Sequence, residues 1–503
     1  MKKLKLSQIK MGAIFSYFAM AINIIVGLVY TPWMVRTIGQ ANYGLYTLSL
    51  SLISIFMLDF GLSSAVSRFV SKYRAEGDQA SVNRILGVVF KLYFAIDALI
   101  ICILTGLFFF LDKIYVKLTP EELETFRILY VMVAGFNILS FPMTPLNGIL
   151  NAYEKFAQLK LCDVFHKLFT VVLVVIALSF RGNVLVVVAA NIVSGLATWI
   201  AKLIVVCTKV PLRLDFRSGG RDLYKTLFGF TVWTTIISVM QRFTHSFAPS
   251  VLGITSSSIE IALYSPAVVI EGYFYTLATA VNGLFLPRIA RFIANKEEDK
   301  ILDLMIRVGR YQITVLGLVF VGFICVGKDF MTLWMGPDYV KSYYCTMIII
   351  LPSLIGCSQQ IANTTVIAKN LIRYQAKFMV ISGILGLVIS YVLSIFLGAI
   401  GVCIGTAVAA LANTIYMIGI YKNKAGIYMP RFYKSCWLRA VPCYLLTAAA
   451  GLFLASVIPV SGWLGLLIKA ACVTVIYLAA MFLLYLPKGD RNDLLKTLRL
   501  KRS

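Results

Sequence analysis

Long apolar stretches, each bounded by charged or turn-forming residues, recur along the whole chain. A run of about 18–25 apolar residues is long enough to cross the hydrocarbon core of a bilayer as an α-helix. The pattern therefore predicts an all-α polytopic membrane protein with about fourteen membrane-spanning helices, and the even number puts both termini on one side. The predicted helices are centred near Asn23, Leu52, Ala98, Phe136, Val172, Ser194, Ser238, Tyr273, Leu318, Leu354, Gly386, Ala410, Ala449 and Val475.

Polar residues follow one face of two consecutive predicted helices, at about 227–254 and 261–286. Positions that are three or four residues apart share a face of an α-helix. An isolated Arg or Glu at the middle of a bilayer costs about 2.5–3.5 kcal/mol on insertion scales. We therefore expect both faces to line one water-filled cavity; the alternative is that Arg242 and Glu271 form only a structural ion pair. The first face carries Thr231, Thr235, Ser238, Arg242 and His245, and the second carries Tyr264, Glu271, Tyr275, Thr279 and Asn282.

Several other charged residues fall within or beside the predicted helices. Lys91 and Asp97 lie in the third, Lys202 in the sixth and Asp59 at the end of the second, while Arg36 follows the first. Long lysine side chains near a helix end can instead reach the aqueous interface, and for Lys202 this is the favoured interpretation.

The composition excludes an ordinary soluble domain. The 503 residues are 60% hydrophobic and 14% charged, with a mean hydropathy of +0.86. Soluble domains are about 45–50% apolar and about 25% charged. This excess of apolar residues cannot be buried in a globular core.

The positive charge of the chain falls mainly on one predicted side of the membrane. With both termini inside, the inner segments contain 36 of the 47 Lys and Arg but only 12 of the 22 Asp and Glu. This is the positive-inside distribution, so the net charge of +25 indicates contact with anionic lipids rather than with nucleic acid. We expect both termini to be cytoplasmic.

The chain offers little for metal, disulfide or cofactor chemistry. Its ten Cys are scattered without a C-x-x-C pair, and it has only two His. We therefore expect no disulfide framework, metal site or cofactor.

A recognisable series of motifs lies between Arg36 and Arg74. It reads R-x-x-G-x-x-x-Y-G-L-Y from Arg36, then an apolar segment, then D-F-G-L from Asp59 and S-R-F-V-S-K-Y from Ser67. This order resembles the amino-terminal region of bacterial polysaccharide flippases, the O-antigen and capsule repeat-unit transporters of the multidrug/oligosaccharidyl-lipid/polysaccharide exporter superfamily. The chain departs from comparable members by carrying Arg242, rather than an acidic residue, in the seventh predicted helix.

The resemblance implies a flippase of the bacterial cytoplasmic (inner) membrane that works beside a polysaccharide polymerase and glycosyltransferases. Its substrate would be a polyprenyl-diphosphate-linked oligosaccharide, moved from the cytoplasmic to the outer leaflet. The cavity would bind the diphosphate through Arg242, Lys91, Arg36 and Lys202. Polar and aromatic residues would line the rest of it, and an acidic residue would couple transport to a proton or ion. The lining would be His245, Ser238, Thr235, Tyr264, Tyr275 and Asn282, and the coupling residue Glu271, Asp97 or Asp59.

The chain also contains a weak internal repeat, made of four short matches that are separated by nearly the same stretch of sequence. Leu45-Tyr46 matches Leu263-Tyr264, Arg68-Phe69-Val70 matches Arg291-Phe292-Ile293, the segment from Ala152 resembles that from Ala368, and Gly182 matches Gly398.

Six predicted helices separate the copies, so the copies have the same orientation. The interpretation is a pair of parallel six-helix lobes around a central cavity, suited to alternating access. The amino-terminal lobe would be 1–208, a cytoplasmic linker 209–225, the carboxy-terminal lobe 226–422, and two further helices with a basic tail 423–503.

Two other functions stay open at this stage. The first is export of drugs or small cations by a member of the same superfamily, which would need an acidic and aromatic lining. The second is a membrane glycosyltransferase or polymerase, which would need catalytic groups on a sizeable loop. The short predicted outer loops speak against an enzyme.

The first prediction concerns Arg242. Arg242→Ala is expected to abolish surface polysaccharide at an unchanged protein level, because a neutral side chain cannot replace the water around an anionic headgroup. Arg242→Lys is expected to keep part of the activity. Quantification of surface polysaccharide in cells tests this, and full activity of the Ala variant would remove Arg242 from the mechanism.

Overall fold

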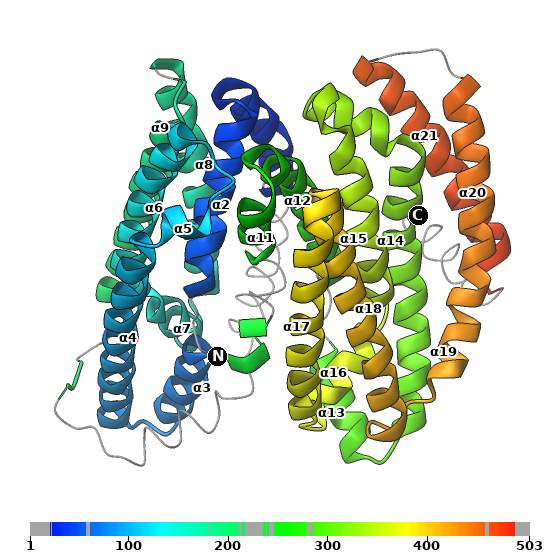
Figure 1. The fold of residues 1–503 in the computed structure, drawn as a ribbon. Coiled ribbons are helices and arrows are strands. Elements are labelled where there is room, and N and C mark those ends of the chain that lie inside the picture. Colours follow the sequence, from blue (N-terminus) through cyan, green and yellow to red (C-terminus); the bar gives the residue numbers. More distant parts are fainter. Residues whose placement is uncertain are drawn as a thin grey trace, which may run out of the picture. The chain divides into compact units, whose positions relative to one another are not determined.

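The computed structural model describes residues 21, 23–56, 61–180, 182–210, 214–216, 235–237, 239–240, 246–279, 285–457 and 462–487. Within these ranges the protein is all-helical, as predicted (Figure 1). The described residues gather into two compact units: Met1–Ser265 with Met379–Val402, and Pro266–Phe378 with Cys403–Ser503.

The first unit contains the helices of the amino-terminal half. Residues 23–38 are helical. The boundaries between the units fall within three helices, α12 (Ser258–Thr279), α17 (Ile372–Leu397) and α18 (Ala399–Asn423). The further elements of the first unit are α2 (Gln40–Phe56), α3 (Leu62–Ala75), α4 (Gln79–Phe108), α5 (Leu111–Ile114), α6 (Pro120–Ser140), η1 (Phe141–Met143), α7 (Pro145–Ala152), α8 (Phe156–Phe180), α9 (Val184–Lys209), α11 (Ala248–Thr255), the start of α12 (Ser258–Thr279) and most of α17 (Ile372–Leu397).

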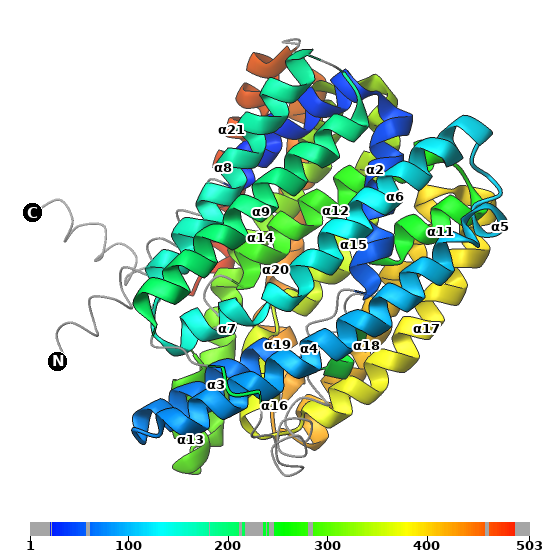
Figure 2. The same ribbon diagram turned by 90° about the vertical axis from the view of Figure 1, so that its left-hand side faces the viewer.

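The second unit contains the rest of α12, the start of α17 and the helices that follow. Within it, α14 packs along both α20 and α21. Figure 2 turns the fold by 90° and brings α8 and α9 of the first unit to the front, where they run side by side. The further elements of the second unit are α13 (Leu286–Ala294), α14 (Glu298–Trp334), η3 (Pro337–Tyr339), α15 (Val340–Cys357), α16 (Gln360–Ala368), most of α18 (Ala399–Asn423), α19 (Met429–Ser435), α20 (Trp437–Val457), α21 (Gly462–Ala480) and a π-helical end, η4 (Met481–Tyr485).

Eleven helices in the described part of the chain are long and apolar enough to cross a membrane. Each contains the centre of one predicted span, from Ala98 to Val475. Of the other three predicted centres, Asn23 and Leu52 lie in shorter described helical segments, and Ser238 lies outside the described residues. Length and hydropathy thus locate the spans correctly.

The outer faces of these helices are apolar. On α8, four large apolar side chains spaced four, three and four residues apart are at least 45% exposed: Leu161, Phe165, Leu168 and Val172. An exposed apolar stripe of this length would be a liability in water. It is the surface expected of a helix that faces lipid.

Two helix ends show the internal repeat in atomic detail. Glu154 and Asn370, at equivalent places in the two copies, both have a left-handed backbone with φ of 57°. At the first, the amides of Glu154 and Lys155 donate to the carbonyls of Asn151 and Leu150. This is the Schellman motif that ends α-helices. The second has the same pair of bonds, from Asn370 to Ile367 and from Leu371 to Val366.

A second pair of helix ends repeats in the same way, and it corrects one predicted match. Gly77 and Lys296 have φ of 77° and 58° and end α3 and α13 in Schellman motifs. The register that pairs these two residues aligns Lys72, rather than Arg68, with Arg291. The sequence match between Arg68 and Arg291 is wrong by one helical turn. The cause is that α3 contains two similar pairs of a basic and an aromatic residue, Arg68-Phe69 and Lys72-Tyr73.

The order of helices repeats as well. The series α3, α4, α6, α7, α8, α9 recurs as α13, α14, α15, α16, α17, α18. Each series contains the same arrangement of long spans and short segments that end in the motifs above. The repeat predicted from the sequence is therefore present in the order of the helices, and the parallel orientation of its copies stays a prediction.

Close backbone contact holds α2 in the first unit. Gly44 on α2 lies directly against the carbonyl oxygen of Ser258 at the start of α12, so that a methyl group at position 44 would overlap that oxygen. Protein interiors accommodate added volume only by moving backbone or side chains. Glycine at this position permits the approach of the two helices.

Gly44→Ala is expected to lower the thermal midpoint of the detergent-solubilised protein, with a loss of about 1–3 kcal/mol that is typical of overpacking. Gly106→Ala on α4 is the matched control, because position 106 faces open space. Alanine has the higher helix propensity, so this control should be neutral or slightly stabilising. Equal midpoints for the two variants would contradict the proposed role of the close contact.

Candidate functional site

The helix pair α8 and α9 places two polar stripes opposite each other. The helices run side by side in the first unit (Figure 1). Each stripe follows helical spacing and lies on the side of its helix away from the exposed apolar face. The stripe on α8 is Lys160, Asp163, His166 and Thr170, and that on α9 is Ser194, Thr198 and Lys202.

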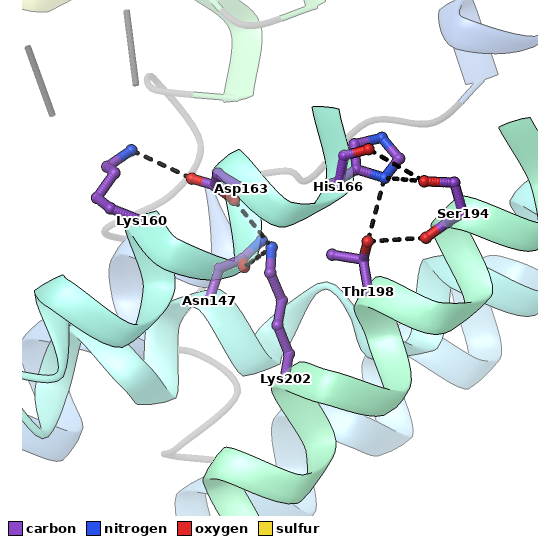
Figure 3. A network of polar contacts seen from close by, with 7 residues as sticks. All are labelled: Asn147, Lys160, Asp163, His166, Ser194, Thr198 and Lys202. Carbon is purple, nitrogen blue, oxygen red and sulfur yellow. Dashed lines mark hydrogen bonds and ion pairs between the residues drawn. The ribbon is translucent and has the colours of Figure 1, made fainter. Parts of the chain in front are cut away.

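Lys202 is the most buried cation of this network (Figure 3). Its side chain is only 9% exposed. The ammonium group donates to Oδ1 of Asn147 on α7 at 3.1 Å and to Oδ1 of Asp163 at 3.3 Å. It also lies 5.4 Å from the centre of the Trp199 ring, a cation–π contact.

Asp163 bridges two lysines. Its Oδ1 accepts from Lys202, and its Oδ2 accepts from Lys160 at 3.3 Å. The side chains of Asp163 and Lys160 are 37% and 38% exposed, so this end of the network is open whereas Lys202 is enclosed. We call Lys160, Asp163 and Lys202 the ionic triad; with both lysines protonated and Asp163 ionised, its net charge is +1.

A neutral network continues along the same two helices. Nδ1 of His166 lies 3.1 Å from Oγ1 of Thr198 and 3.2 Å from Oγ of Ser194. The hydroxyl group of Thr198 donates to the carbonyl of Ser194, and that of Thr170 donates to Oγ of Ser194. The contacts that His166 and Thr170 on α8 make with Ser194 and Thr198 on α9 join the two helices beside the ionic triad.

The ionic triad lies close to one end of the helix pair. Asp163 is seven residues from the start of α8, and Lys202 is seven residues from the end of α9. At 1.5 Å per residue, both lie roughly 10 Å along the axis from those ends. Since the hydrocarbon core of a bilayer is about 30 Å thick, we expect positions this close to the end of a membrane-spanning helix to lie near the lipid headgroups.

The structure places the predicted residues of the first unit in different surroundings. Lys91 on α4 and Arg36 are exposed, and Thr235 is half-buried. Asp97 on α4 is buried, and its Oδ1 has no hydrogen-bond partner. Lys202 is buried in the protein and paired with Asp163, a carboxylate of the same helix pair. Its position near the aqueous interface of the membrane stays a prediction.

Tyr264 and Glu271, predicted to share one polar face of α12, are both buried, with 2% and 8% exposure, whereas Tyr275 is 47% exposed. Glu271 accepts a hydrogen bond of 2.8 Å from Ser353 on α15. Four predicted cavity residues and one predicted coupling residue lie outside the described residues: Arg242, His245, Ser238, Asn282 and Asp59.

Asp163, Lys160 and His166 were missed by the sequence interpretation. In the predicted topology Lys160 and Asp163 belong to an inner segment between two membrane-spanning helices, but the structure includes both in α8. The apolar-run criterion marks only the part of a helix that lies in hydrocarbon, and α8 continues beyond it. The three- and four-residue spacing of polar positions on α8 and α9, applied as it was to 227–286, would have found them.

Comparison with known proteins identifies the family of the chain. The sequence profile of a family described as polysaccharide biosynthesis protein matches residues 9–292, more than half of the chain. The protein belongs to this polysaccharide biosynthesis protein family. This is the group to which the motifs after Arg36 point, and the α8–α9 site lies within the matched region.

Two relatives extend the similarity over most of the chain. A protein of Escherichia coli (strain K12) whose name describes it as an O-antigen transporter is 21% identical over 421 residues, 80% of this chain and 94% of that protein. The membrane protein EpsK of Bacillus subtilis (strain 168) is 19% identical over 497 residues, 96% of each chain.

The fold is similar to that of a solved transporter. The lipid II flippase MurJ, in an inward closed conformation, matches with a TM-score of 0.71 at 14% identity, over 94% of this chain and 98% of that one. At this identity the match concerns the fold. The family member described here is thus a multi-pass membrane protein with the fold of that flippase.

The ionic triad generates a prediction about stability. Removal of one partner of a buried ion pair costs about 3–5 kcal/mol, but solvent screens a carboxylate as open as Asp163, so we expect about 1–2 kcal/mol for Asp163→Ala. Lys160→Ala should cost less, since Lys160 is itself half-exposed and leaves Lys202 paired. Thermal midpoints in detergent at two salt concentrations test the order; a larger loss for Lys160→Ala would contradict the assigned burial.

Proposed function

We propose that this protein is a flippase for polyprenyl-diphosphate-linked oligosaccharide repeat units, which it moves from the cytoplasmic to the outer leaflet of the bacterial cytoplasmic membrane by alternating access. The observation that carries the proposal is membership of the polysaccharide biosynthesis protein family. The similarity to the E. coli relative, named as an O-antigen transporter, and the fold shared with a lipid II flippase support it.

The substrate's charge determines what the protein must supply. A diphosphate cannot enter hydrocarbon without groups that replace its water, and cationic side chains near the membrane interior serve this purpose. Lys202 has the burial that such a role needs, and Asn147 holds its ammonium group in position. We include Arg242, Lys91 and Arg36 in the same role on the sequence argument.

The remaining parts of the mechanism follow from the repeat and the charge distribution. The two six-helix lobes, 1–208 and 226–422, would rock about the linker 209–225 to expose the headgroup site to each leaflet in turn. The positive-inside distribution supports cytoplasmic termini. Glu271, Asp97 or Asp59 would bind the coupling proton or ion, and a polysaccharide polymerase and glycosyltransferases would be the functional partners.

Reconstitution tests the function directly. Proteoliposomes that contain the purified protein and a fluorescently labelled polyprenyl-diphosphate oligosaccharide are treated with a membrane-impermeant quencher. Translocation is expected to expose the protected label faster than in protein-free liposomes. Lys202→Ala should slow it about tenfold, the size of effect expected when one hydrogen bond to a charged group is lost.

The matched control is Lys469→Ala. Lys469 on α21 is another lysine of a membrane-spanning helix, with a side chain 13% exposed and paired to Asp329 at 2.9 Å. It lies in the two added helices, outside both lobes, so its loss should leave the rate unchanged. No translocation by the wild-type protein, or efflux of cationic dyes in its place, would contradict the proposed function.

A further inference from the structure

We infer that Asp163 is an internal counter-anion that holds the place of the substrate's diphosphate between Lys160 and Lys202. The inference rests on the proposed function and assigns the headgroup a position and a competitor. In the absence of substrate the carboxylate occupies the anion site, and an incoming diphosphate displaces it.

The geometry of the ionic triad is that of an anion site with a loosely held occupant. Two ammonium groups from different helices meet the two oxygens of one carboxylate, each at 3.3 Å. Charge-assisted hydrogen bonds between ammonium and carboxylate groups are usually about 2.7–2.9 Å. The carboxylate is thus too far from either lysine for an optimal bond, and the excess positive charge attracts a further anion.

The difference in burial determines which member of the ionic triad an incoming anion can displace. Lys202 is enclosed and has lost its water, so it needs an anion beside it at all times. Asp163 and Lys160 lie on the open side, where a ligand can approach and where a displaced carboxylate can be hydrated. Asn147 accepts from Lys202 independently of Asp163, so the ammonium group keeps its position during the exchange.

The position in the membrane selects the kind of anion. The ionic triad lies roughly 10 Å from the ends of two helices that are long enough to span a bilayer, so we expect it near the level of the lipid headgroups. A diphosphate that is attached to a membrane-embedded polyprenyl chain presents its charge at this level without leaving the bilayer. A soluble anion has no such anchor.

The internal repeat argues that the ionic triad is not required by the fold. In the register that pairs the Schellman residues Glu154 and Asn370, Asp163 corresponds to Met379 and Lys202 to Ile418, whereas Asn147 corresponds to Asn363. The second copy forms the corresponding helices, α17 and α18, with apolar residues at these two positions. Its asparagine is left with a buried Oδ1 that has no hydrogen-bond partner.

Binding measurements on the full-length protein test the inference. Wild-type and variant proteins in nanodiscs of neutral phosphatidylcholine are titrated with polyprenyl diphosphate, and binding is followed through tryptophan fluorescence. Trp199 lies beside Lys202 and supplies the signal, which Trp199→Phe identifies among the six tryptophans of the chain.

The variants are expected to change affinity in opposite directions. Asp163→Asn removes the competing charge and should tighten binding at least threefold. Lys202→Ala should weaken it about tenfold, since one charge-assisted hydrogen bond is lost. Lys160→Gln, on the open side where a substitution is tolerated, should weaken it about threefold. Asp329→Asn and Lys469→Ala, the paired control, should leave affinity unchanged.

Three results would overturn the inference. If Asp163→Asn weakens binding or leaves it unchanged, the carboxylate does not compete with the diphosphate. If that variant does not fold, unchanged affinity of the Lys160→Gln variant also contradicts the inference. Equal competition by inorganic diphosphate or by phosphatidylglycerol would show a general phosphate site. Wild-type protein that binds no polyprenyl diphosphate would end both this inference and the proposed function, whereas normal wild-type binding with an unaltered Asp163→Asn ends the inference alone.

Discussion

A lysine ammonium group that has given up its water must keep an anion beside it, and this constraint organises the α8–α9 pair. Lys202 satisfies it through Asp163 on the neighbouring helix and through Asn147 on α7. Three helices are thereby tied together at one point, and the hydroxyl and imidazole contacts around His166 extend that tie along the helix axis. Apolar packing alone would hold the two helices but would not fix which residues face each other.

The same constraint explains why a charge can be retained at this depth. The second copy of the repeat forms the corresponding helices α17 and α18 with Met379 and Ile418 in place of Asp163 and Lys202, so neither helix needs these charges in order to form. Lys202 thus ties three helices together in the first copy, while the second copy has no cation at the corresponding position; the anion site proposed above accounts for this difference. The family's role in polysaccharide biosynthesis makes an anionic lipid carrier the natural candidate.

Most of the fold could be predicted from the sequence, because the length of an apolar run is set by the thickness of the bilayer. That rule located every long span within the described residues, from Ala98 to Val475. It could not say where α8 begins, since a helix continues into the polar interface without an apolar signal. Asp163 was read as a charge outside the membrane for this reason, and Lys202 was left without its partner.

The internal repeat shows a second limit of prediction from the sequence, which concerns the register between the two copies. Short sequence matches found its period to within a few residues, but only the helix-end hydrogen bonds fix the register, because a Schellman motif specifies the exact residue with positive φ. With the register fixed, the two copies differ in chemistry more than in shape. Asn147 holds a lysine, and Asn363 keeps the amide without one. At the positions of Asp163 and Lys202 the second copy has Met379 and Ile418, so the ion pair is present in only one copy of the repeat.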